Sequence, residues 1–141
     1  QGKLRLWQSG SFSGHPVAMA AGLATLEGLT PEIFDKLDRL TQRLIAGLED
    51  VFSSTRTVAT IVASGSTFSI YFTSGPVRNY RDVAAADKKS LSGVFLSLLN
   101  RGYYLSAGLS MNSLSAAMNE SHIDGFVRAV GEALEENKNP V

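Results

Sequence analysis

The residues with the clearest potential for chemistry form a Gly/Ser-rich loop, Gly10–Gly14, which runs into a helix predicted to begin at Pro16. Pro16 suits the first helical turn, because its missing backbone N–H would have no partner there. The N–H groups around this helix start point outward from the positive end of the helix dipole, and together they favour an anion such as phosphate. Ser11 and Ser13 add hydroxyl groups that can bond phosphate oxygens. Short Gly/Ser loops are common, so a simple loop capped by a helix remains an alternative interpretation.

Other catalytic patterns are absent from the sequence. The chain has no cysteine, which excludes disulfides and thiolate chemistry and offers no cysteine ligands for a metal. Its two histidines are far apart in sequence, and we expect a capping or packing role for His15 and a surface role for His122. The Gly-rich loop lacks the lysine of a P-loop, and no serine lies in a strand–turn–helix nucleophile elbow.

The composition predicts one ordinary globular domain. With 141 residues and 44% apolar side chains, the chain is long enough to bury a hydrophobic core. Its 13 basic and 13 acidic residues cancel, so bulk charge attracts neither nucleic acid nor an anionic membrane. The longest apolar run is far shorter than a membrane span. The lack of cysteine is consistent with a cytoplasmic location.

The first half of the chain predicts two helices after Lys3–Gln8, which is a short strand or an extended lead-in and in which Trp7 has a packing role. Pro16–Leu29 is crowded with small residues, which predicts a buried helix that neighbours approach closely. Thr30 is a good N-cap for a second helix, since Pro and an acid follow it. That helix carries an apolar stripe of residues three and four apart: Ile33, Leu37, Leu40, Leu44, Leu48 and Val51.

A hairpin is predicted next, from Thr57–Ala63 through the turn Ser64–Ser66 to Thr67–Thr73. Alternation along the second strand predicts that Phe68, Ile70 and Phe72 share one face. The polar run Gly75–Tyr80 then reads as a structured surface turn.

The second half of the chain predicts a third long helix over Asp82–Arg101, firm from about Asp87 and ended by Gly102. Two short strands, Tyr103–Leu105 and Ser113–Ala117, follow around a loop. Asn119 caps a last helix, whose apolar stripe holds Ile123, Phe126, Val127, Val130 and Leu134. The polar tail Glu135–Val141 is expected to fray. Hairpin strands with helices over one face indicate an α+β fold.

The segment Gly10–Gly22 resembles a stretch of the class III pyridoxal-phosphate-dependent aminotransferases, which has the pattern G-T-x-S/N-G-N-P-x-A-M-A-A-G. In that family the Thr hydroxyl and the loop backbone reach the cofactor phosphate of the neighbouring subunit. Ser11 stands at the Thr position and keeps the hydroxyl, whereas His15 stands at the Asn position. The resemblance therefore implies that Gly10, Ser11 and Phe12 help to bind pyridoxal 5'-phosphate.

Later stretches resemble the glutamate-1-semialdehyde aminomutases within this class. Thr67–Tyr80 is similar to S-x-F-x-x-F-F-T-x-G-P-V-x-N-Y, and Phe95–Leu105 is similar to F-x-x-L-L-x-x-G-V-Y-L. Ile123–Asp124 matches the start of the family's last helix, so the resemblance covers nearly the whole chain in order. It fails at Ser106–Ser115, where the aminomutases carry P-S-x-F-E-A-x-F-x-S with a Glu near the substrate. A related transaminase with another amino donor or acceptor is therefore an open alternative.

The resemblance implies the small C-terminal domain of a fold-type-I pyridoxal-phosphate enzyme, an antiparallel sheet with helices on one face, preceded by a long interdomain helix. Residues 1–29 would end the large domain, and residues 30–141 would form the small one. We expect this small domain to close over the substrate. We expect the loop Ser106–Met111 to shape substrate specificity. No Arg lies between Arg101 and Arg128 that could grip a substrate carboxylate from this loop.

The resemblance also implies an activity and partners. In the family, an amino group moves between small-molecule amino and keto substrates through a Schiff base on a lysine, and the enzyme is a homodimer. That lysine, and the Asp that pairs with the cofactor's ring nitrogen, lie upstream of Gln1 in the family, so we expect no catalytic residue here. Lys3 is no substitute, because it stands too close to the phosphate loop. The chain alone is expected to be inactive, and its start at Gln1 without Met suggests a fragment.

Two other hypotheses stay open. The chain could be a stand-alone, non-catalytic domain that dimerises or binds a partner without the cofactor. It could also be a generic phosphate-binding module that uses the loop Gly10–Pro16. An upstream domain with a lysine would distinguish the enzyme from both.

Overall fold

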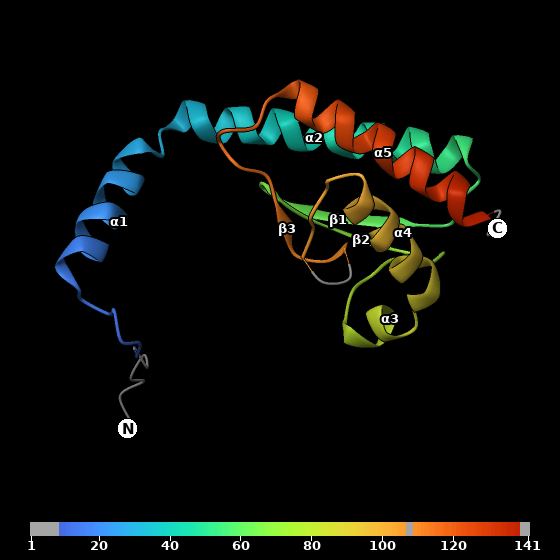
Figure 1. Ribbon diagram of the computed structural model, residues 1–141, viewed down its shortest axis with the longest axis horizontal. Coiled ribbons are helices and arrows are strands. Elements are labelled where there is room, and N and C mark those ends of the chain that lie inside the picture. The colour runs from blue at the N-terminus through green and yellow to red at the C-terminus, as the bar shows by residue number, and fades with distance from the viewer. Residues whose placement is uncertain (1–8, 107–108, 139–141) are drawn as a thin grey trace. The chain divides into compact units, whose positions relative to one another are not determined.

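A computed structural model describes residues 9–106 and 109–138 (Figure 1). The predicted lead-in strand Lys3–Gln8 and Trp7 lie outside these residues. Contacts divide the chain into two compact units, Gln1–Phe34 and Asp35–Val141. None of the helices in the described ranges is long and apolar enough to cross a membrane.

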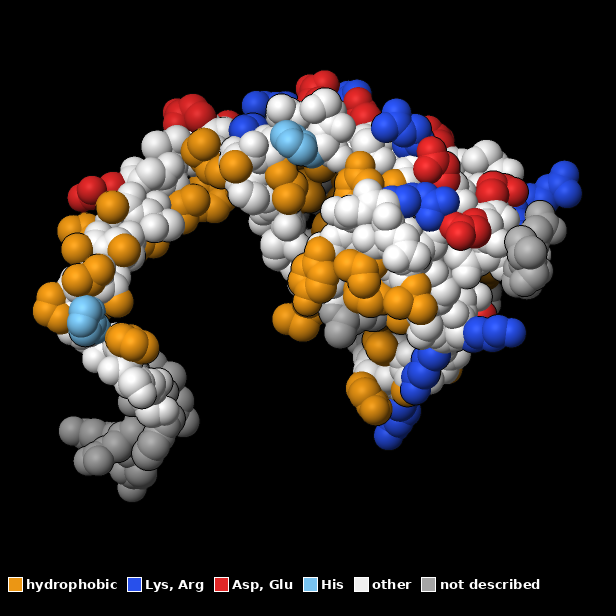
Figure 2. Space-filling model, viewed as in Figure 1, with side chains coloured by type: hydrophobic (Ala, Val, Ile, Leu, Met, Phe, Trp, Pro, Cys, Tyr) orange, Lys and Arg blue, Asp and Glu red, His pale blue; other side chains and the backbone are white. Residues whose placement is uncertain are grey.

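Helix α1 (Pro16–Gly28) forms where Pro16 and the run of small residues predicted it. Our expectation that it is buried is wrong for this chain, because none of its residues is buried. Hydrophobic side chains are spread along its surface in Figure 2, and Val17, Leu23 and Leu26 are each more than half exposed. The physical reason is that the described part of the first unit contains only α1 and the first turn of the next helix, too little to cover it.

Helix α2 (Pro31–Ser54) begins where the Thr30–Pro31 signal predicted it. The Thr30 carbonyl accepts the Ile33 N–H at 3.0 Å. A hydrogen bond with the Thr30 side chain lowers the pKa of Glu32, whose carboxylate lies in the first turn. The predicted stripe is confirmed at its centre, with Ile33 and Val51 half-buried at its ends. The buried residues of α2 are Leu37, Leu40, Thr41, Leu44, Leu48 and Phe52.

The predicted hairpin is confirmed as strands β1 (Thr60–Ser64) and β2 (Thr67–Tyr71), which pair antiparallel. Gly65 adopts a left-handed φ of 54° in the two-residue loop between them, a conformation that glycine accepts without steric cost. Strand β3 (Asn112–Ser113) adds to the other side of β2 and completes a sheet of order β1-β2-β3. Phe68, Ile70 and Phe72 are buried, as the alternation predicted.

The helix predicted over Asp82–Arg101 is instead two helices, α3 (Tyr80–Ala84) and α4 (Lys88–Asn100). Competing caps cause the break. Asn79 and Asp82 form a reciprocal capping box at the start of α3. The Asp87 carboxylate then accepts the Lys89 and Ser90 N–H groups at 2.9 and 3.2 Å and starts α4. The prediction that the helix is firm from about Asp87 is confirmed.

Helix α4 ends at Asn100, and Gly102, two residues later, has a φ of 86° and stops the helix as predicted. The Gly102 N–H bonds the Leu99 carbonyl at 3.0 Å, and the Tyr103 N–H bonds the Leu98 carbonyl at 2.9 Å. These two bonds define a Schellman motif. They also explain why the predicted strand Tyr103–Leu105 is absent, since Tyr103 is committed to the helix end.

The predicted strand Ser113–Ala117 is also wrong, because only its first residue lies in β3. The Leu114 N–H still bonds the Ser66 carbonyl at 2.9 Å, but a turn follows in which the Met118 N–H bonds the Ser115 carbonyl. Lys36 of α2 holds this turn, because its Nζ donates to the Ala116 carbonyl at 2.7 Å.

Helix α5 (Glu120–Lys138) follows Asn119, whose Oδ1 accepts the His122 N–H at 3.4 Å. The tail predicted to fray remains helical to Lys138, because Lys138 Nζ bonds the Thr55 carbonyl and, at 2.9 Å, Glu135. The stripe is confirmed except at Val127, which is half-buried. The buried residues of α5 are Ile123, Phe126, Ala129, Val130, Ala133 and Leu134.

Helices α2 and α5 run side by side and parallel (Figure 1). They approach closely at two glycines. A Cβ on Gly47 would lie 2.9 Å from Val127 Cγ2, and one on Gly131 would lie 3.7 Å from Val51 Cγ1. Arg43 of α2 also donates two hydrogen bonds to the Asp124 carboxylate of α5, from Nε to Oδ1 at 2.7 Å and from Nη2 to Oδ2 at 2.8 Å.

Truncation of the core of α4 should destabilise the second unit. Leu98 is fully buried, so Leu98→Ala is expected to lower the free energy of unfolding by about 2–5 kcal/mol, the usual cost of a lost side chain and its cavity. Leu96, two residues away on the same helix, is 56% exposed and supplies the matched control. Denaturant unfolding measures both, and equal effects of Leu98→Ala and Leu96→Ala would contradict this core.

Acid should destabilise the fold through carboxylates whose pKa is lowered in the folded state. Hydrogen bonds with Arg43 lower the pKa of Asp124, and those with Ser97 and Arg101 lower the pKa of Glu136. Because the unfolded chain takes up these protons first, stability is present above about pH 4 and is lost as the pH falls further. Asp124→Asn should reduce the pH dependence of unfolding below about pH 4. An unchanged pH profile in this variant would show that the Arg43 pair contributes nothing.

Candidate functional site

The predicted phosphate loop is a compact turn at the start of α1. The Ser13 N–H bonds the Gly10 carbonyl at 3.0 Å, and the His15 N–H bonds the Phe12 carbonyl at 3.1 Å. Gly10 and Gly14 both have positive φ, 145° and 75°, conformations that glycine adopts readily. The structure thus brings Gly10, Ser11 and Phe12 together in one tight loop that is exposed in this chain.

The side chain of His15, the N-cap residue of α1, packs against a neighbouring ring and does not cap the helix. Its ring meets the Phe12 ring edge-on, with centroids 5.8 Å apart, and it makes no side-chain bond to the helix start. Of the two roles expected for His15, packing is the one seen. The first N–H groups of α1 are consequently left without a side-chain cap.

The loop has donors suited to a phosphate group. The uncapped N–H groups of α1 carry the positive end of the helix dipole. The Ser11 side chain is exposed at the loop that precedes them and offers a hydroxyl donor. The described residues of the first unit therefore fit the phosphate of a cofactor, whereas the ring of such a cofactor needs groups from elsewhere.

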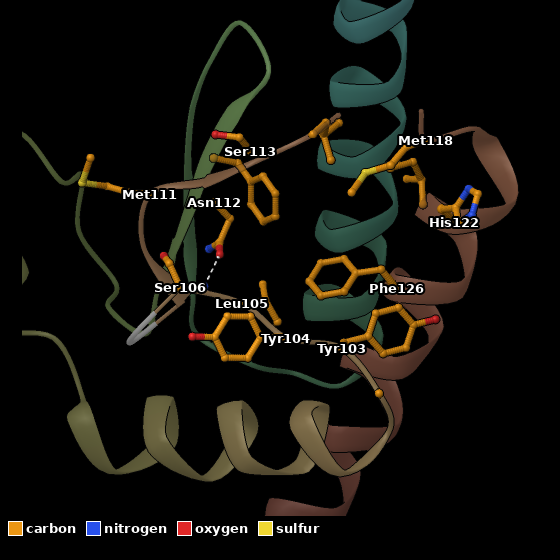
Figure 3. A pocket seen from close by; sticks show the side chains of 14 residues that line it. Tyr103, Tyr104, Leu105, Ser106, Met111, Asn112, Ser113, Met118, His122 and Phe126 are labelled. Atoms are coloured by element: carbon orange, nitrogen blue, oxygen red, sulfur yellow. Dashed lines mark hydrogen bonds between the residues drawn. The ribbon is translucent and has the colours of Figure 1, made fainter. Parts of the chain in front are cut away.

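A second candidate region is a cavity of about 540 Å³ within the second unit, called here the aromatic cavity. Its walls come from β2, from the segment after α4, from β3 and its flanks, and from the start of α5 (Figure 3). The centroid of the Phe126 ring lies 6.1 Å from the centroid of the Phe68 ring and 5.7 Å from that of the Tyr103 ring. Met118 and His122 lie at one end of the view and Met111 at the other.

One side of the aromatic cavity is a loop closed by Asn112. The Asn112 Oδ1 accepts the Ser106 N–H at 2.8 Å, which joins the two ends of the loop. The Met111 N–H bonds Ser69 Oγ at 2.9 Å and fastens the loop to β2. Leu109, which is fully buried, and Met111 both adopt a left-handed backbone, with φ near 55°. Such conformations in non-glycine residues are costly and concentrate at functional sites.

The rim of the aromatic cavity at α5 is formed by His122. The ring Nδ1 of His122 accepts a hydrogen bond from the Asn119 backbone N–H at 3.1 Å, and the His122 backbone N–H donates to Asn119 Oδ1. This reciprocal pair is a capping box with His in the usual place of Glu or Gln. The expectation of a surface role is confirmed, since His122 is exposed.

Comparison with known proteins shows what this chain is similar to. No protein-family model matches it. The chain is 36% identical over 130 residues to the glutamate-1-semialdehyde 2,1-aminomutase of Sorangium cellulosum, and 36% identical over 132 residues to that of Thermus thermophilus. Each alignment covers 92% of this chain. The chain is homologous to the C-terminal portion of these aminomutases. It spans about 30% of their length.

Solved structures agree with this aminomutase-like fold. An omega-transaminase from Sphaerobacter thermophilus is 28% identical with a TM-score of 0.80, over 95% of this chain and 31% of the transaminase. A β-phenylalanine aminotransferase from Variovorax paradoxus is 29% identical with a TM-score of 0.75, over 95% of this chain and 31% of its own. The glutamate-1-semialdehyde aminomutase from Pseudomonas aeruginosa, at 22% identity and a TM-score of 0.79, shows the fold alone, over 96% of this chain and 31% of its own.

Sequence reasoning missed the aromatic cavity of this aminomutase-like chain. Tyr103 was placed in a strand, Phe126 in a helix stripe, and Met118 was not singled out. The cavity unites segments up to 58 positions apart, since its lining runs from Phe68 to Phe126. Within the part of the chain that the structure describes, no cluster of residues suits a metal ion. The only local signal was the aromatic pair Tyr103–Tyr104 next to a loop that departs from the aminomutase pattern.

Loss of the Asn112 amide should release the loop that it closes. Asn112→Ala removes the acceptor for the Ser106 N–H, so hydrogen exchange of that amide is expected to accelerate by about tenfold, the scale of one lost hydrogen bond. Ser113→Ala, at the exposed neighbouring position, is the control. If both variants leave the exchange of Ser106 unchanged, Asn112 does not hold the loop.

Proposed function

We propose that this chain is the C-terminal portion of a pyridoxal-phosphate-dependent enzyme that transfers amino groups, related to the glutamate-1-semialdehyde aminomutases and class III transaminases. The observation that carries the proposal is the similarity of 92% of the chain to the aminomutases at 36% identity. The loop geometry is consistent with it, because the predicted phosphate contacts form one exposed turn at an uncapped helix start.

In the intact enzyme, the loop holds the phosphate of pyridoxal 5'-phosphate. Gly10, Ser11 and Phe12 provide this part of the site, with the Ser11 hydroxyl and nearby backbone N–H groups as donors. The cofactor, when bound, supplies the electron sink that amino-group transfer requires. In a homodimer, the loop of one subunit would contact the cofactor of its partner. Residues 1–29 would complete the large domain and residues 30–141 would form the small domain that closes over the substrate.

The Schiff-base lysine belongs to the preceding part of the intact protein in this proposal, so the 141-residue chain alone is inactive. The loop Ser106–Met111 helps to select the substrate, and residues 107–108 of that loop lie outside the described residues. Because the Phe-Glu-Ala of the aminomutases is missing here, a transamination between small amino and keto substrates is favoured over isomerisation. The enzyme would act in the cytoplasm.

A second candidate function is a stand-alone domain that associates with another protein without the cofactor. The observation in its favour is α1, which has one charged residue, Glu27, and is exposed on all sides. A helix that is apolar all round requires cover. The reading frame upstream of Gln1 separates the two candidates, since only the enzyme needs a lysine-bearing large domain.

Removal of the Ser11 hydroxyl tests the cofactor contact. In the intact enzyme, Ser11→Ala is expected to weaken binding of pyridoxal 5'-phosphate by about 1–2 kcal/mol, the scale of one hydrogen bond to a charged group. Titration of the apoenzyme with cofactor, followed by absorbance, gives the dissociation constant. Ser9→Ala, at an exposed position just outside the loop Gly10–Gly14, is the matched control and should change it less. An unchanged dissociation constant in Ser11→Ala would remove Ser11 from the site.

A further inference from the structure

We propose that His122 makes the start of α5 a pH-sensitive switch. The neutral side chain holds the turn before the helix in place, and the protonated side chain releases this turn and opens the aromatic cavity at that end. The inference goes beyond the proposed function and does not depend on it, because every contact that carries it lies within the second unit.

The His122 ring makes its contact with the turn only when it is neutral. Its Nδ1 accepts the Asn119 backbone N–H at 3.1 Å, so this nitrogen carries a lone pair and the ring proton is on Nε2. A protonated imidazole has a donor at both nitrogens and no acceptor. Uptake of a proton therefore sets two donors against each other. Because the side chain is exposed, the ring can turn into solvent and leave Asn119.

Histidine at this position is what makes the cap respond to pH. The usual partner residue of a capping box is Glu or Gln. Gln does not titrate, and the carboxylate of Glu ordinarily remains an acceptor down to about pH 4. Histidine is the side chain whose ordinary change of charge falls between about pH 5 and pH 8. The bond to Asn119 is consequently present above this range and is lost as the pH falls through it.

Charges on α5 itself do not favour a protonated ring. An imidazolium at His122 would lie in the first turn, near the positive end of the helix dipole. The neighbouring carboxylates of Glu120 and Asp124 are both bound by Arg43 of α2, at 3.3 and 2.7 Å. Their negative charge is therefore already balanced in part by the Arg43 guanidinium.

The other elements around His122 add no negative charge. Lys36 and Arg39 of α2 line a hollow together with residues at the start of α5, and both are cations. Tyr103 and Tyr104, from the segment after α4, line the aromatic cavity with His122 and are uncharged at neutral pH. The described residues of β2 and β3 that line this cavity carry no charge. Protonation of His122 thus adds a cation where cations already outnumber carboxylates.

The turn before α5 is held by side chains of two helices, and one of them is His122. Lys36 Nζ donates to the Ala116 carbonyl at 2.7 Å, which fastens the turn to α2. The bond from the Asn119 N–H to His122 fastens its other end to α5. Among the described residues, this N–H has no second acceptor. Loss of the His122 bond leaves Lys36 as the one helix side chain that holds the turn.

The aromatic cavity responds because Met118 belongs to this turn. Met118 is half-buried and lies at the same end of the cavity as His122 (Figure 3). The residues that follow are anchored in the core, since Ile123 and Val130 are 2% and 1% exposed. Release of the turn is therefore local. Met118 moves away from the wall while the rest of α5 stays in place, and the entrance of the cavity widens.

The test measures amide hydrogen exchange in the full chain at about pH 8 and about pH 5, the ends of the range in which histidine ordinarily titrates. Each rate is compared with the rate of an unstructured peptide at the same pH, which gives the protection of that amide. We expect protection of the Asn119 and Met118 amides to fall by about tenfold between pH 8 and pH 5, the scale of one lost hydrogen bond. The Val130 amide, in the buried part of α5, should keep its protection.

Three substitutions assign this change to His122. His122→Gln keeps an uncharged acceptor, so Asn119 and Met118 should remain protected at both pH values. His122→Ala removes the acceptor, so both amides should exchange rapidly at both pH values. His15→Gln removes the other histidine of the chain and is the matched control, which should respond to pH as the unmodified chain does.

Four results would overturn the proposal. Equal protection of Asn119 at the two pH values would show that the bond does not respond to protonation. Loss of protection at Asn119 that does not extend to Met118 would show that the cavity stays closed. A similar loss at Val130 would mean general unfolding in acid. A His122→Gln chain that still loses protection in acid would assign the titration to another group.

Discussion

The reversal of the chain at Gly102 is the constraint on which the second unit's candidate site depends. The left-handed φ of 86° at Gly102 allows the Leu98 and Leu99 carbonyls at the end of α4 to accept backbone N–H groups. The chain reverses its direction directly after the helix. Tyr103 therefore leaves the helix beside Phe126, and Leu105 enters the core two residues later. A residue with a Cβ would strain this turn, although no neighbour would obstruct it. Backbone conformation, rather than space, thus fixes where the aromatic cavity begins.

Most elements of the fold could be predicted from local signals. Thr30–Pro31, Gly65 and Gly102 each mark an element boundary by a backbone property that acts over a few residues. The failures also have local causes. Asp82 was predicted to begin one long helix, but its carboxylate accepts the Asn79 N–H and caps the start of a separate short helix. Two plausible caps in one helical run cannot be ranked without their hydrogen bonds.

The site was less predictable, because it depends on contacts between distant segments. The loop of Gly10, Ser11 and Phe12 could be proposed as a phosphate site because its residues are consecutive and match a family pattern. The aromatic cavity could not, since no periodicity indicates that Phe68, Tyr103 and Phe126 meet. The burial of α1 was predicted from its composition, yet burial depends on what else is present. The chain spans about 30% of the length of the aminomutases it resembles, and none of the residues of α1 is buried by the part of the chain that the structure describes.

The reciprocal Gly–Val contacts between α2 and α5 have a consequence for how the protein can change. The Val127 side chain of α5 packs against Gly47 of α2, and the Val51 side chain of α2 packs against Gly131 of α5. Each helix thus contributes one glycine and one valine, four residues apart in its sequence. Sliding either helix along its axis would set valine against helix backbone, which fixes the register of the pair. A larger residue at position 47 would meet Val127 directly. Positions 47 and 127 are therefore energetically coupled, so the effects of substitutions at the two positions on stability are non-additive. A larger residue at position 47 is tolerated best when the side chain at position 127 is made smaller.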